Sequence, residues 1–458
     1  MQGDTISAIA TAQGEGGIGI IRLSGDKAVD IADRLFQPVS GRKLMDYESH
    51  RAVYGRIVDV EGRTVDEAIA LIMKAPHSYT REDVVELQCH GGVMSLRKTL
   101  ALTYEHGARP AEGGEFTKRA FLNGRLDLSQ AQAVMDIITA KTDRSLKMAT
   151  GHLTGQFSQQ IKAWRHEILG QIAHLEAAID FPEDEVDDVV TETVREKVVD
   201  VRKHIAKLLQ TAGTGRILRE GLMTAIVGKP NVGKSSLLNA LLQEERAIVT
   251  DIPGTTRDSI EEYANVGGVP LRIIDTAGIR ATEDVVERIG VEKSRQMINQ
   301  AALVLALFDG SRPLDHEDEE ILSLLAGQEA IVLLNKSDLA AVVTAEELSA
   351  QAAVPVIEIS TKDYSGMDKL TDAIKAKVYG GAVLADEGSF VSDERQVNLL
   401  RNADKHLAAA LTTIDAGMGL DFISIDLRSA WETLGEITGD TVGEDIIDEI
   451  FSKFCIGK

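Results

Sequence analysis

Residues 228–235 read Gly228-Lys-Pro-Asn-Val-Gly-Lys-Ser235 and fit the pattern G-x-x-x-x-G-K-[ST]. The apolar segment Thr224–Val227 precedes them, and the helix-like segment Ser236–Leu242 follows. The pattern needs this context, because backbone N–H groups and a helix N-terminus must converge on phosphate oxygens. The segment predicts a nucleotide-binding loop in which Lys234 neutralises the β- and γ-phosphates and Ser235 binds Mg²⁺.

Apolar strands alternate with helical segments between about Gly215 and Gly381, which is typical of a doubly wound, mostly parallel sheet. Helical spacing of apolar residues dominates 121–214 and resumes in 382–458. We therefore expect an α/β domain at 215–381 that is inserted into one helical domain made of two segments. Its expected strands are Met223–Val227, Leu271–Ile274, Leu303–Phe308, Ile331–Leu334 and Val356–Ile359, with the strand-like Ile260–Val266 beside them.

Residues 1–120 have a different sequence pattern, in which short apolar runs alternate with a few helical stretches. They predict a small mixed α/β domain at the N-terminus. The whole chain is thus expected to be a multidomain protein that combines α/β and all-α parts. The apolar runs of the first domain are Ile18–Leu23, Val53–Val60, Glu67–Met73 and Val84–Cys89.

Composition excludes several function classes. The 458 residues include 49 basic and 72 acidic side chains, a net charge of −23, so a broad basic face for nucleic acid is not expected. Cys89 and Cys455 are the only cysteines, too few for a disulfide framework or a four-cysteine zinc site. No apolar run approaches the roughly 20 residues that span a bilayer. We expect a cytoplasmic protein with no membrane segment.

Two later motifs indicate which nucleotide is bound. Asp275-Thr-Ala-Gly278 follows a strand, where the acid reaches Mg²⁺ through water and the glycine N–H meets the γ-phosphate. Asn335-Lys-Ser-Asp338 follows another strand, where an aspartate accepts hydrogens from guanine N1 and N2. Adenine offers no such pair, so the motif predicts GTP. Ser360-Thr-Lys362 occupies the place of a further base-contacting loop.

The segment between these motifs has the composition of a switch loop. Thr250-Asp-Ile-Pro-Gly-Thr-Thr-Arg-Asp258 is polar and contains glycine. A threonine of such a loop closes over the γ-phosphate and completes the Mg²⁺ shell. Thr255 and Thr256 are the candidates.

The residue after Gly278 is Ile279, where Ras-like enzymes have a glutamine that orients water. Because an alkyl group cannot orient water, other groups must do so and must supply positive charge. Several acids and bases nearby are candidates for these roles. Each acid could equally be a charged residue at the start of a helix, and each base could equally be an ordinary surface residue. The candidates are Glu283, Asp284 and Glu287 for the water, and Arg257 and Arg280 for the charge.

Taken together, these features resemble the MnmE (TrmE) family of tRNA modification GTPases over essentially the full length. The resemblance rests on a GTPase domain inserted into a helical one and on short segments spread along the chain. These segments are Asn231 within the phosphate loop, the switch Gly254–Asp258, the terminus Phe454–Lys458, and the N-terminal segments Gly17–Gly25 and Glu115–Asn123.

The resemblance implies a homodimer joined through the N-terminal domains, whose GTPase domains approach each other with GTP and K⁺ bound. It implies that K⁺ takes the place of an arginine finger and that Glu287 orients the attacking water through a second water. The implied ligands are Asn231, Thr250, Ile252 and Thr255 for K⁺, and Ser235 and Thr256 for Mg²⁺; Glu287, Lys234 and Thr256 form the expected catalytic set.

Motifs and resemblance together give the expected GTP contacts. They comprise the phosphate loop, the switch, the second strand end and the two base-reading loops. The residues are Asn231, Val232, Gly233, Lys234, Ser235, Ser236, Thr250, Asp251, Ile252, Pro253, Gly254, Thr255, Asp275, Thr276, Ala277, Gly278, Asn335, Lys336, Asp338, Ser360, Thr361 and Lys362.

The resemblance further implies 5-formyl-tetrahydrofolate, or a related folate, as one-carbon source at Arg22, Glu82, Arg125 and Lys458. It implies joint action with the flavoprotein MnmG to add a carboxymethylaminomethyl-type group at C5 of the wobble uridine (U34) of certain tRNAs. Cys455 is a candidate for the one-carbon chemistry or a small buried apolar residue.

Two rival functions remain open at this point. One is a signalling or ribosome-assembly GTPase that modifies no base, although 382–458 has no Lys/Arg cluster to bind RNA. The other is a folate-binding metabolic protein with a regulatory GTPase.

Overall fold

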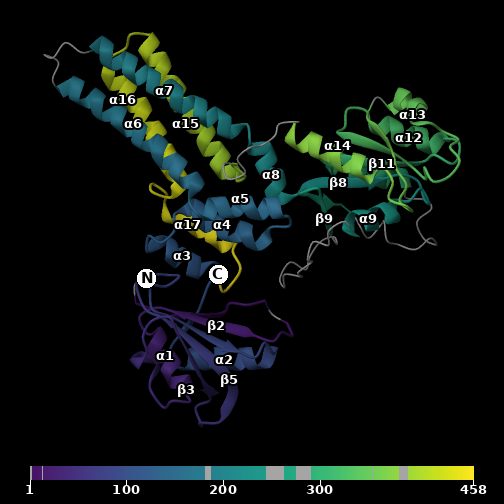
Figure 1. The fold of residues 1–458 in the computed structure, drawn as a ribbon. Helices are drawn as coiled ribbons and strands as arrows, with labels where there is room; N and C mark the ends of the chain where they lie inside the picture. Colours follow the sequence, from purple (N-terminus) through teal and green to yellow (C-terminus); the bar gives the residue numbers. More distant parts are fainter. Residues whose placement is uncertain are drawn as a thin grey trace.

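The computed structural model describes residues 3–12, 14–180, 187–243, 262–274, 290–352, 354–380 and 390–458. These residues form two β-sheets and a long helix bundle that occupy three separate regions (Figure 1). The multidomain α/β and all-α fold class expected from the sequence is confirmed. None of the described helices combines the length and apolar character needed to cross a bilayer.

The first sheet has the strand order β3-β4-β5-β6-β2-β1-β7, and among these strands only β1 and β7 pair in parallel. Alternation of side chains sets its faces: in β5, Ala68, Ala70 and Ile72 are buried while the residues between them are more exposed. Two helices, α1 (Ala28–Leu35) and α2 (Val93–Glu105), pack on the buried face. The strands are β1 (Ile6–Ile9), β2 (Gly19–Ser24), β3 (Phe36–Pro38), β4 (Arg51–Val58), β5 (Thr64–Met73), β6 (Val84–Cys89) and β7 (Arg109–Pro110).

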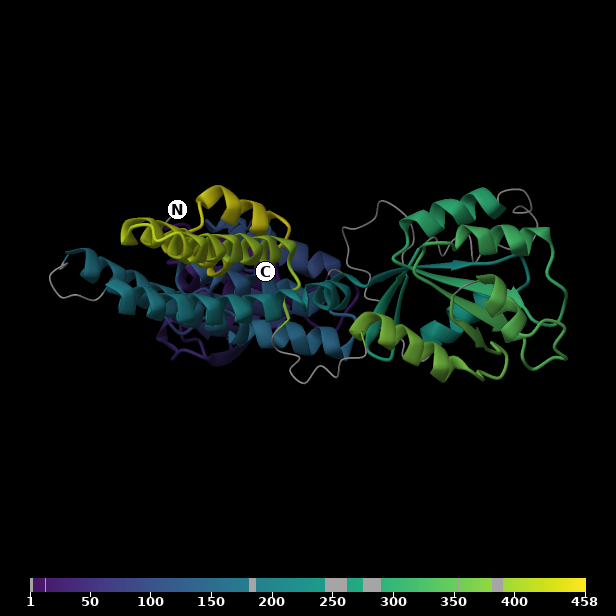
Figure 2. The same cartoon turned by 90° about the horizontal axis from the view of Figure 1, so that it is seen from above.

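The bundle joins segments from before and after the second sheet. Helices α6 and α7 pack against α15 and α16, and the four share one apolar core (Figures 1 and 2). Buried residues recur at helical spacing, as in Ile161, Ile168 and Ile172 of α6. The bundle helices are α6 (Gln156–Asp180), α7 (Asp187–Leu209), α15 (Glu394–Asp415) and α16 (Leu420–Thr438); the shorter helices α3 (Glu115–Leu122), α4 (Leu128–Thr139), α5 (Asp143–Leu153) and α17 (Glu444–Ser452) lie toward the first sheet.

The second sheet has the order β13-β12-β11-β8-β10-β9 and is parallel except for the β9–β10 pair. Nearly continuous apolar runs form its central strands, as burial on both faces requires. Because parallel strands end at one edge, the loops after β8, β11 and β12 gather there. The elements are β8 (Leu222–Val227), β9 (Glu262–Val266), β10 (Val269–Ile273), β11 (Leu303–Asp309), β12 (Ala330–Asn335), β13 (Val356–Glu358), α9 (Lys234–Gln243), α11 (Gly290–Gln300), α12 (His316–Leu324), α13 (Ala345–Ala352) and α14 (Met367–Tyr379).

A half-buried cluster of ion pairs connects the two places where the chain passes between the bundle and the second sheet. Helix α8 (Ala212–Glu220) leads into β8, and its Arg219 donates to Asp136 of α4 and to Asp393 before α15, each at 2.8 Å. Gly213 and Gly215, which the sequence predicts at the boundary between the helical and the α/β domain, both lie inside α8. A Cβ at Gly215 would lie 2.3 Å from the carbonyl oxygen of Val391, so close packing requires glycine there.

The C-terminus returns to the first sheet, so that both chain ends lie near each other (Figure 1). Ile456 forms an antiparallel bridge with Gly113, and the backbone N–H of Phe116 donates to the carbonyl oxygen of Lys458 at 3.0 Å. Gly457 has φ of +91°, and a Cβ there would lie 2.2 Å from the carbonyl oxygen of Ile9. The last residues are therefore part of the N-terminal structure.

Candidate functional site

The phosphate loop connects β8 to α9, which begins at Lys234. Both glycines of this loop are required, because each has a positive φ and because neighbouring atoms leave no space for a Cβ. Gly228 has φ of +148°, and a Cβ there would lie 2.5 Å from the carbonyl oxygen of Leu307. Gly233 has φ of +107°, and its Cβ would lie 2.2 Å from Nδ2 of Asn335. The predicted strand, loop and helix are confirmed, with glycine where no side chain fits.

Lys234 is positioned by the loop itself. Its Nζ donates to the carbonyl oxygens of Gly228 at 2.7 Å and Lys229 at 2.6 Å. Burial lowers the pKa of Lys234 to about 8, because neither carbonyl supplies a compensating negative charge. An anionic ligand at this loop would restore the charged form.

Asn335 links three of the predicted segments. It ends β12, is only 1 % exposed, and donates through Nδ2 to the carbonyl oxygen of Val232 at 2.7 Å. Its Oδ1 accepts from the backbone N–H of Thr361 at 3.1 Å. The phosphate loop and the two base-reading loops are thus brought into one site.

Asp338 lies at the far end of the same motif. Ser360 Oγ donates to its Oδ1 at 3.1 Å, and Lys362 Nζ is 3.4 Å from its Oδ2. The carboxylate is therefore held by two residues of the loop after β13. This arrangement can orient two acceptor oxygens toward a pair of donors on a base.

The sequence reasoning missed Asp309 and Ser311, which lie beside the predicted GTP contact Lys336. Lys336 Nζ donates to Asp309 Oδ2 at 2.6 Å. Burial alone would raise the pKa of Asp309, but hydrogen bonds from Lys336 and Ser311 outweigh it and lower the pKa. The position of Asp309 at the end of a buried strand was a usable signal, because polar residues at such ends meet at one edge.

Part of the predicted site lies outside the described residues, and its assigned roles stay predictions. This part comprises the switch loop and the segment after β10. The residues are Thr250, Asp251, Ile252, Pro253, Gly254, Thr255, Thr256, Asp275, Thr276, Ala277, Gly278 and Glu287, together with Arg257, Ile279, Arg280, Glu283 and Asp284.

Comparison with known proteins decides the family. Residues 128–455 match the model of the MnmE helical domain, and residues 5–125 match that of the GTP-binding protein TrmE N-terminus. The chain belongs to the MnmE family of tRNA modification GTPases. The tRNA modification GTPase MnmE of Geobacillus kaustophilus is 54 % identical over 99 % of both chains, and that of Alkaliphilus metalliredigens is 50 % identical over 99 % of both.

Membership of the MnmE family gives the coarse function. The chain is a GTP-binding GTP hydrolase with a role in tRNA modification. Among the functions that the sequence left open, tRNA modification agrees with the family, whereas ribosome assembly does not.

A second cluster, far from the phosphate loop in the sequence, combines three of the residues that resemblance to the MnmE family placed at a folate. The guanidinium carbons of Arg22 and Arg125 lie 5.7 Å and 4.6 Å from the ring centre of Tyr79. Arg22 also lies 5.5 Å from the ring centre of Phe116 and donates to the carbonyl oxygen of Gly457 at 3.3 Å. Arg22 and Arg125 thus lie over the ring of Tyr79, and Arg22 also contacts the C-terminal tail.

Lys458 and Cys455 complete this end of the cluster. Burial and the neighbouring positive charge of Arg22 lower the pKa of Lys458. Both effects disfavour a bare ammonium group and would be relieved by an anion. Cys455 is a free thiol of intermediate exposure, so it is not the fully buried residue of the alternative interpretation.

Glu82 is held by a neighbouring ionic network. It accepts from Ser24 Oγ at 2.7 Å and from Arg119 Nη1 at 3.2 Å. Arg119 is only 8 % exposed and also pairs with Asp4 at 2.7 Å and Glu115 at 3.0 Å. No role was predicted for Arg119, although it lies within Glu115–Asn123, one of the segments on which the family resemblance rests.

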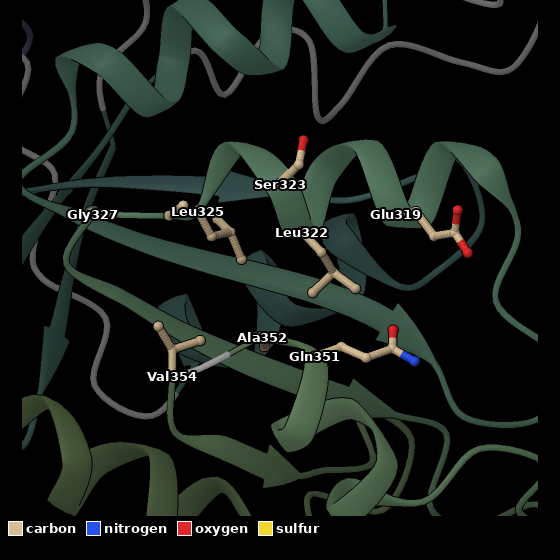
Figure 3. Close-up of a pocket in the computed structure, with 9 residues that line it drawn as sticks. Glu319, Leu322, Ser323, Leu325, Gly327, Gln351, Ala352 and Val354 are labelled. Atoms are coloured by element: carbon tan, nitrogen blue, oxygen red, sulfur yellow. The ribbon is translucent and has the colours of Figure 1, made fainter.

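A hollow of about 470 Å³ lies away from both sites, between α12 and the end of α13 (Figure 3). Leu322 and Leu325 line one side and Val354 the other, while Glu319 and Gln351 lie toward one end. It contains none of the predicted site residues. The nucleotide site is therefore defined by loops and hydrogen bonds, and this hollow is no part of it.

The lowered pKa of Lys234 predicts a pH dependence of GTP binding. Phosphate favours the ammonium form, so binding must return a proton to Lys234 wherever the free lysine is neutral. We expect affinity to fall as the pH rises through about 8, by up to about tenfold per pH unit. Titration of a fluorescent guanine nucleotide between about pH 7 and about pH 9 measures this.

The matched control for this pH series is Lys234→Arg, because a guanidinium stays charged throughout the range. Its affinity should change less with pH than that of the parent. Equal slopes for the two chains would show that Lys234 is not the titrating group.

Proposed function

We propose that this chain is a K⁺-dependent GTPase that acts with a flavoprotein partner, MnmG, on tRNA. Together they would add a carboxymethylaminomethyl-type group at C5 of the wobble uridine of certain tRNAs. The observation that carries the proposal is the contact of Asn335 with both the phosphate loop and the loop after β13, in a chain that matches MnmE relatives over 99 % of its length. The proposed setting is the cytoplasm.

We further propose a division into four segments. An N-terminal dimerisation and folate-binding domain (1–120) would precede the first part of the helical domain (121–214), the GTPase domain (215–381) and the second helical part (382–458). Support comes from the separate cores of the two sheets and from the single core that α6, α7, α15 and α16 share. The active form would be a homodimer.

In the proposed GTP site, Asn335, Asp338 and the loop after β13 read guanine, and the phosphate loop with Lys234 binds the phosphates. Mg²⁺ would be bound by Ser235 and Thr256. K⁺ would be bound by Asn231 with Thr250, Ile252 and Thr255, and Glu287 would orient the water. A cation between the β- and γ-phosphates stabilises the negative charge that develops there during cleavage.

In the proposed folate site, Arg22, Arg125 and Lys458 would bind the carboxylates of 5-formyl-tetrahydrofolate. Tyr79 offers an aromatic face, and Glu82 offers acceptor oxygens for the N–H groups of the pterin ring. The half-buried Lys458 supports an anionic ligand, since burial and Arg22 both lower its pKa. The bound folate would supply the one-carbon unit, with Cys455 beside it as a candidate reactant.

Substitution Arg22→Ala should weaken folate binding by about tenfold or more, because a charge-assisted hydrogen bond contributes about 1.5–3 kcal/mol. Equilibrium dialysis of 5-formyl-tetrahydrofolate measures the affinity. Arg51→Ala, at an exposed arginine of the same sheet, is the matched control and should bind as the parent does. Equal losses in both variants, or none in either, would remove Arg22 from the folate site.

The function itself is tested by nucleoside analysis of tRNA from cells that lack this chain. We expect the carboxymethylaminomethyl-type uridine to be absent and to return when the parent chain is supplied. Normal wobble uridines in the deficient cells would rule out the modification function and favour a regulatory GTPase.

A further inference from the structure

Lys229, the second residue of the phosphate loop, has a buried cationic side chain with no role in the functions described above. It is 9 % exposed and donates a short hydrogen bond to Asp315, the residue before α12. Its Nζ also lies 3.6 Å from Asp318 Oδ2 and 3.8 Å from Glu317 Oε2. One ammonium group thus faces three carboxylates at the start of a neighbouring helix.

These acids form an ordered structure of their own. Asp315 caps α12, since its side chain accepts from the backbone N–H groups of Glu317 at 3.1 Å and Asp318 at 3.4 Å. The hydrogen bond from Lys229 lowers the pKa of Asp315, so the carboxylate stays charged at neutral pH. Asp318 is 2 % exposed, and within the described part of the chain its Oδ1 has no hydrogen-bond partner. Lys229 is therefore the cation that compensates a partly buried cluster of negative charge.

The backbone of Lys229 contacts Lys234, the lysine that is expected to bind the phosphates. Its carbonyl oxygen accepts from Lys234 Nζ at 2.6 Å. The ion pairs at the end of the side chain therefore restrain the peptide that positions Lys234. Movement of Lys229 would change both the place of Lys234 and the charge near the phosphates.

We propose that Lys229 is a positioning residue for GTP: it anchors the phosphate loop to α12 and neutralises the acids that would otherwise repel the phosphates. The proposal rests on the assignment of 228–235 as the phosphate loop. Without the ammonium, Asp315, Glu317 and Asp318 would leave uncompensated negative charge beside a loop that must bind a highly charged anion. Separate variants can test the anchoring of the loop and the neutralisation of the acids.

The first comparison is between Lys229→Met and Lys229→Arg in the full-length chain. Titration of a fluorescent GTP analogue should give about tenfold or more weaker binding for Lys229→Met, because one partner of a buried charge pair is lost. Lys229→Arg should bind within about threefold of the parent, since a guanidinium can reach the same carboxylates. Because repulsion is screened by salt, choline chloride at about 0.5 M should reduce the deficit of Lys229→Met.

The second comparison adds Asp315→Asn, which removes a negative charge and keeps a good helix cap. If the acids repel GTP once Lys229 is lost, the double variant Lys229→Met/Asp315→Asn should bind at least about threefold more tightly than Lys229→Met. This double variant also contains one fewer unpaired charge, so it remains testable if Lys229→Met does not fold.

Three results would overturn the proposal: Lys229→Met binding as tightly as the parent, equal and salt-independent losses in the methionine and arginine variants, or a double variant that binds no more tightly than Lys229→Met. Lys234→Ala separates this failure from a failure of the phosphate-loop assignment. Loss of nucleotide binding in Lys234→Ala with any of those three results would overturn only the role of Lys229. Parent-like binding by Lys234→Ala would overturn the assignment of the loop and the proposal with it.

Discussion

Substitution Asp338→Asn is expected to change the preference of the chain from GTP to xanthosine triphosphate. A carboxylate accepts from both N1–H and the N2 amino group of guanine, whereas an asparagine amide presents one acceptor and one donor. Xanthine has an oxygen in place of the N2 amino group, so the amide would pair with it and would clash with guanine. An unpaired buried donor costs about 1–3 kcal/mol, and the change acts on both bases, so the ratio of affinities should shift by about a hundredfold or more.

The contacts around Asp338 can accommodate an asparagine at this position. Ser360 Oγ and Lys362 Nζ contact different oxygens of the carboxylate, at 3.1 Å and 3.4 Å, so the single amide oxygen of an asparagine can keep one of these two contacts. Asp363→Asn is the matched control, because Asp363 lies on the same loop and accepts locally from the backbone N–H of Ser365. Competition between the two nucleotides measures the ratio. An unchanged guanine preference in Asp338→Asn would show that another residue reads the base.

Replacing Na⁺ by K⁺ is expected to raise the rate of GTP hydrolysis by at least about tenfold, because an arginine finger contributes about 10³–10⁵ in kcat and a cation in its place can supply part of that effect. Ile279 has an alkyl side chain at the position where Ras-like enzymes orient water through an amide. If the chain lacks that group, positive charge from a monovalent ion becomes the larger share of catalysis. Turnover measured in Na⁺ and in K⁺ at equal ionic strength gives the ratio.

Asn231 provides a control that does not strain the loop. Its φ is +64°, a conformation that glycine adopts freely, so Asn231→Gly removes the side chain and leaves the backbone in place. We expect this variant to lose most of the K⁺ stimulation and to retain most of its affinity for GTP. Equal rates in the two salts, or full K⁺ stimulation in Asn231→Gly, would contradict the proposed cation site.

The sequence predicted those parts of the fold that depend on local patterns. The apolar runs around 223–227, 303–308 and 331–334 became β8, β11 and β12, because strands buried on both faces need uninterrupted apolar residues. The short strands β1, β3 and β7 were missed, since two to four residues are too few to show alternation. Local patterns also located the phosphate loop and the guanine motif.

Contacts between distant segments could not be predicted in this way. Lys229 and Asp315 are 86 positions apart, and their pairing depends on how α12 packs beside β8. The same holds for Glu82 and Arg119, which meet only after β6 and α3 are in place. The docking of Gly457 against Ile9 likewise requires the completed first sheet. Such pairs are set by tertiary structure, and neither partner differs locally from a surface charge or a loop glycine.

The central claim is that GTP hydrolysis at this site drives the modification of tRNA. It is tested most directly by tRNA nucleoside analysis in cells whose only copy of the chain is Lys234→Ala, expressed at the parent level. Loss of the phosphate-binding ammonium should leave wobble uridine unmodified, as in cells without the chain. Parent-level modified uridine in those cells would contradict the claim.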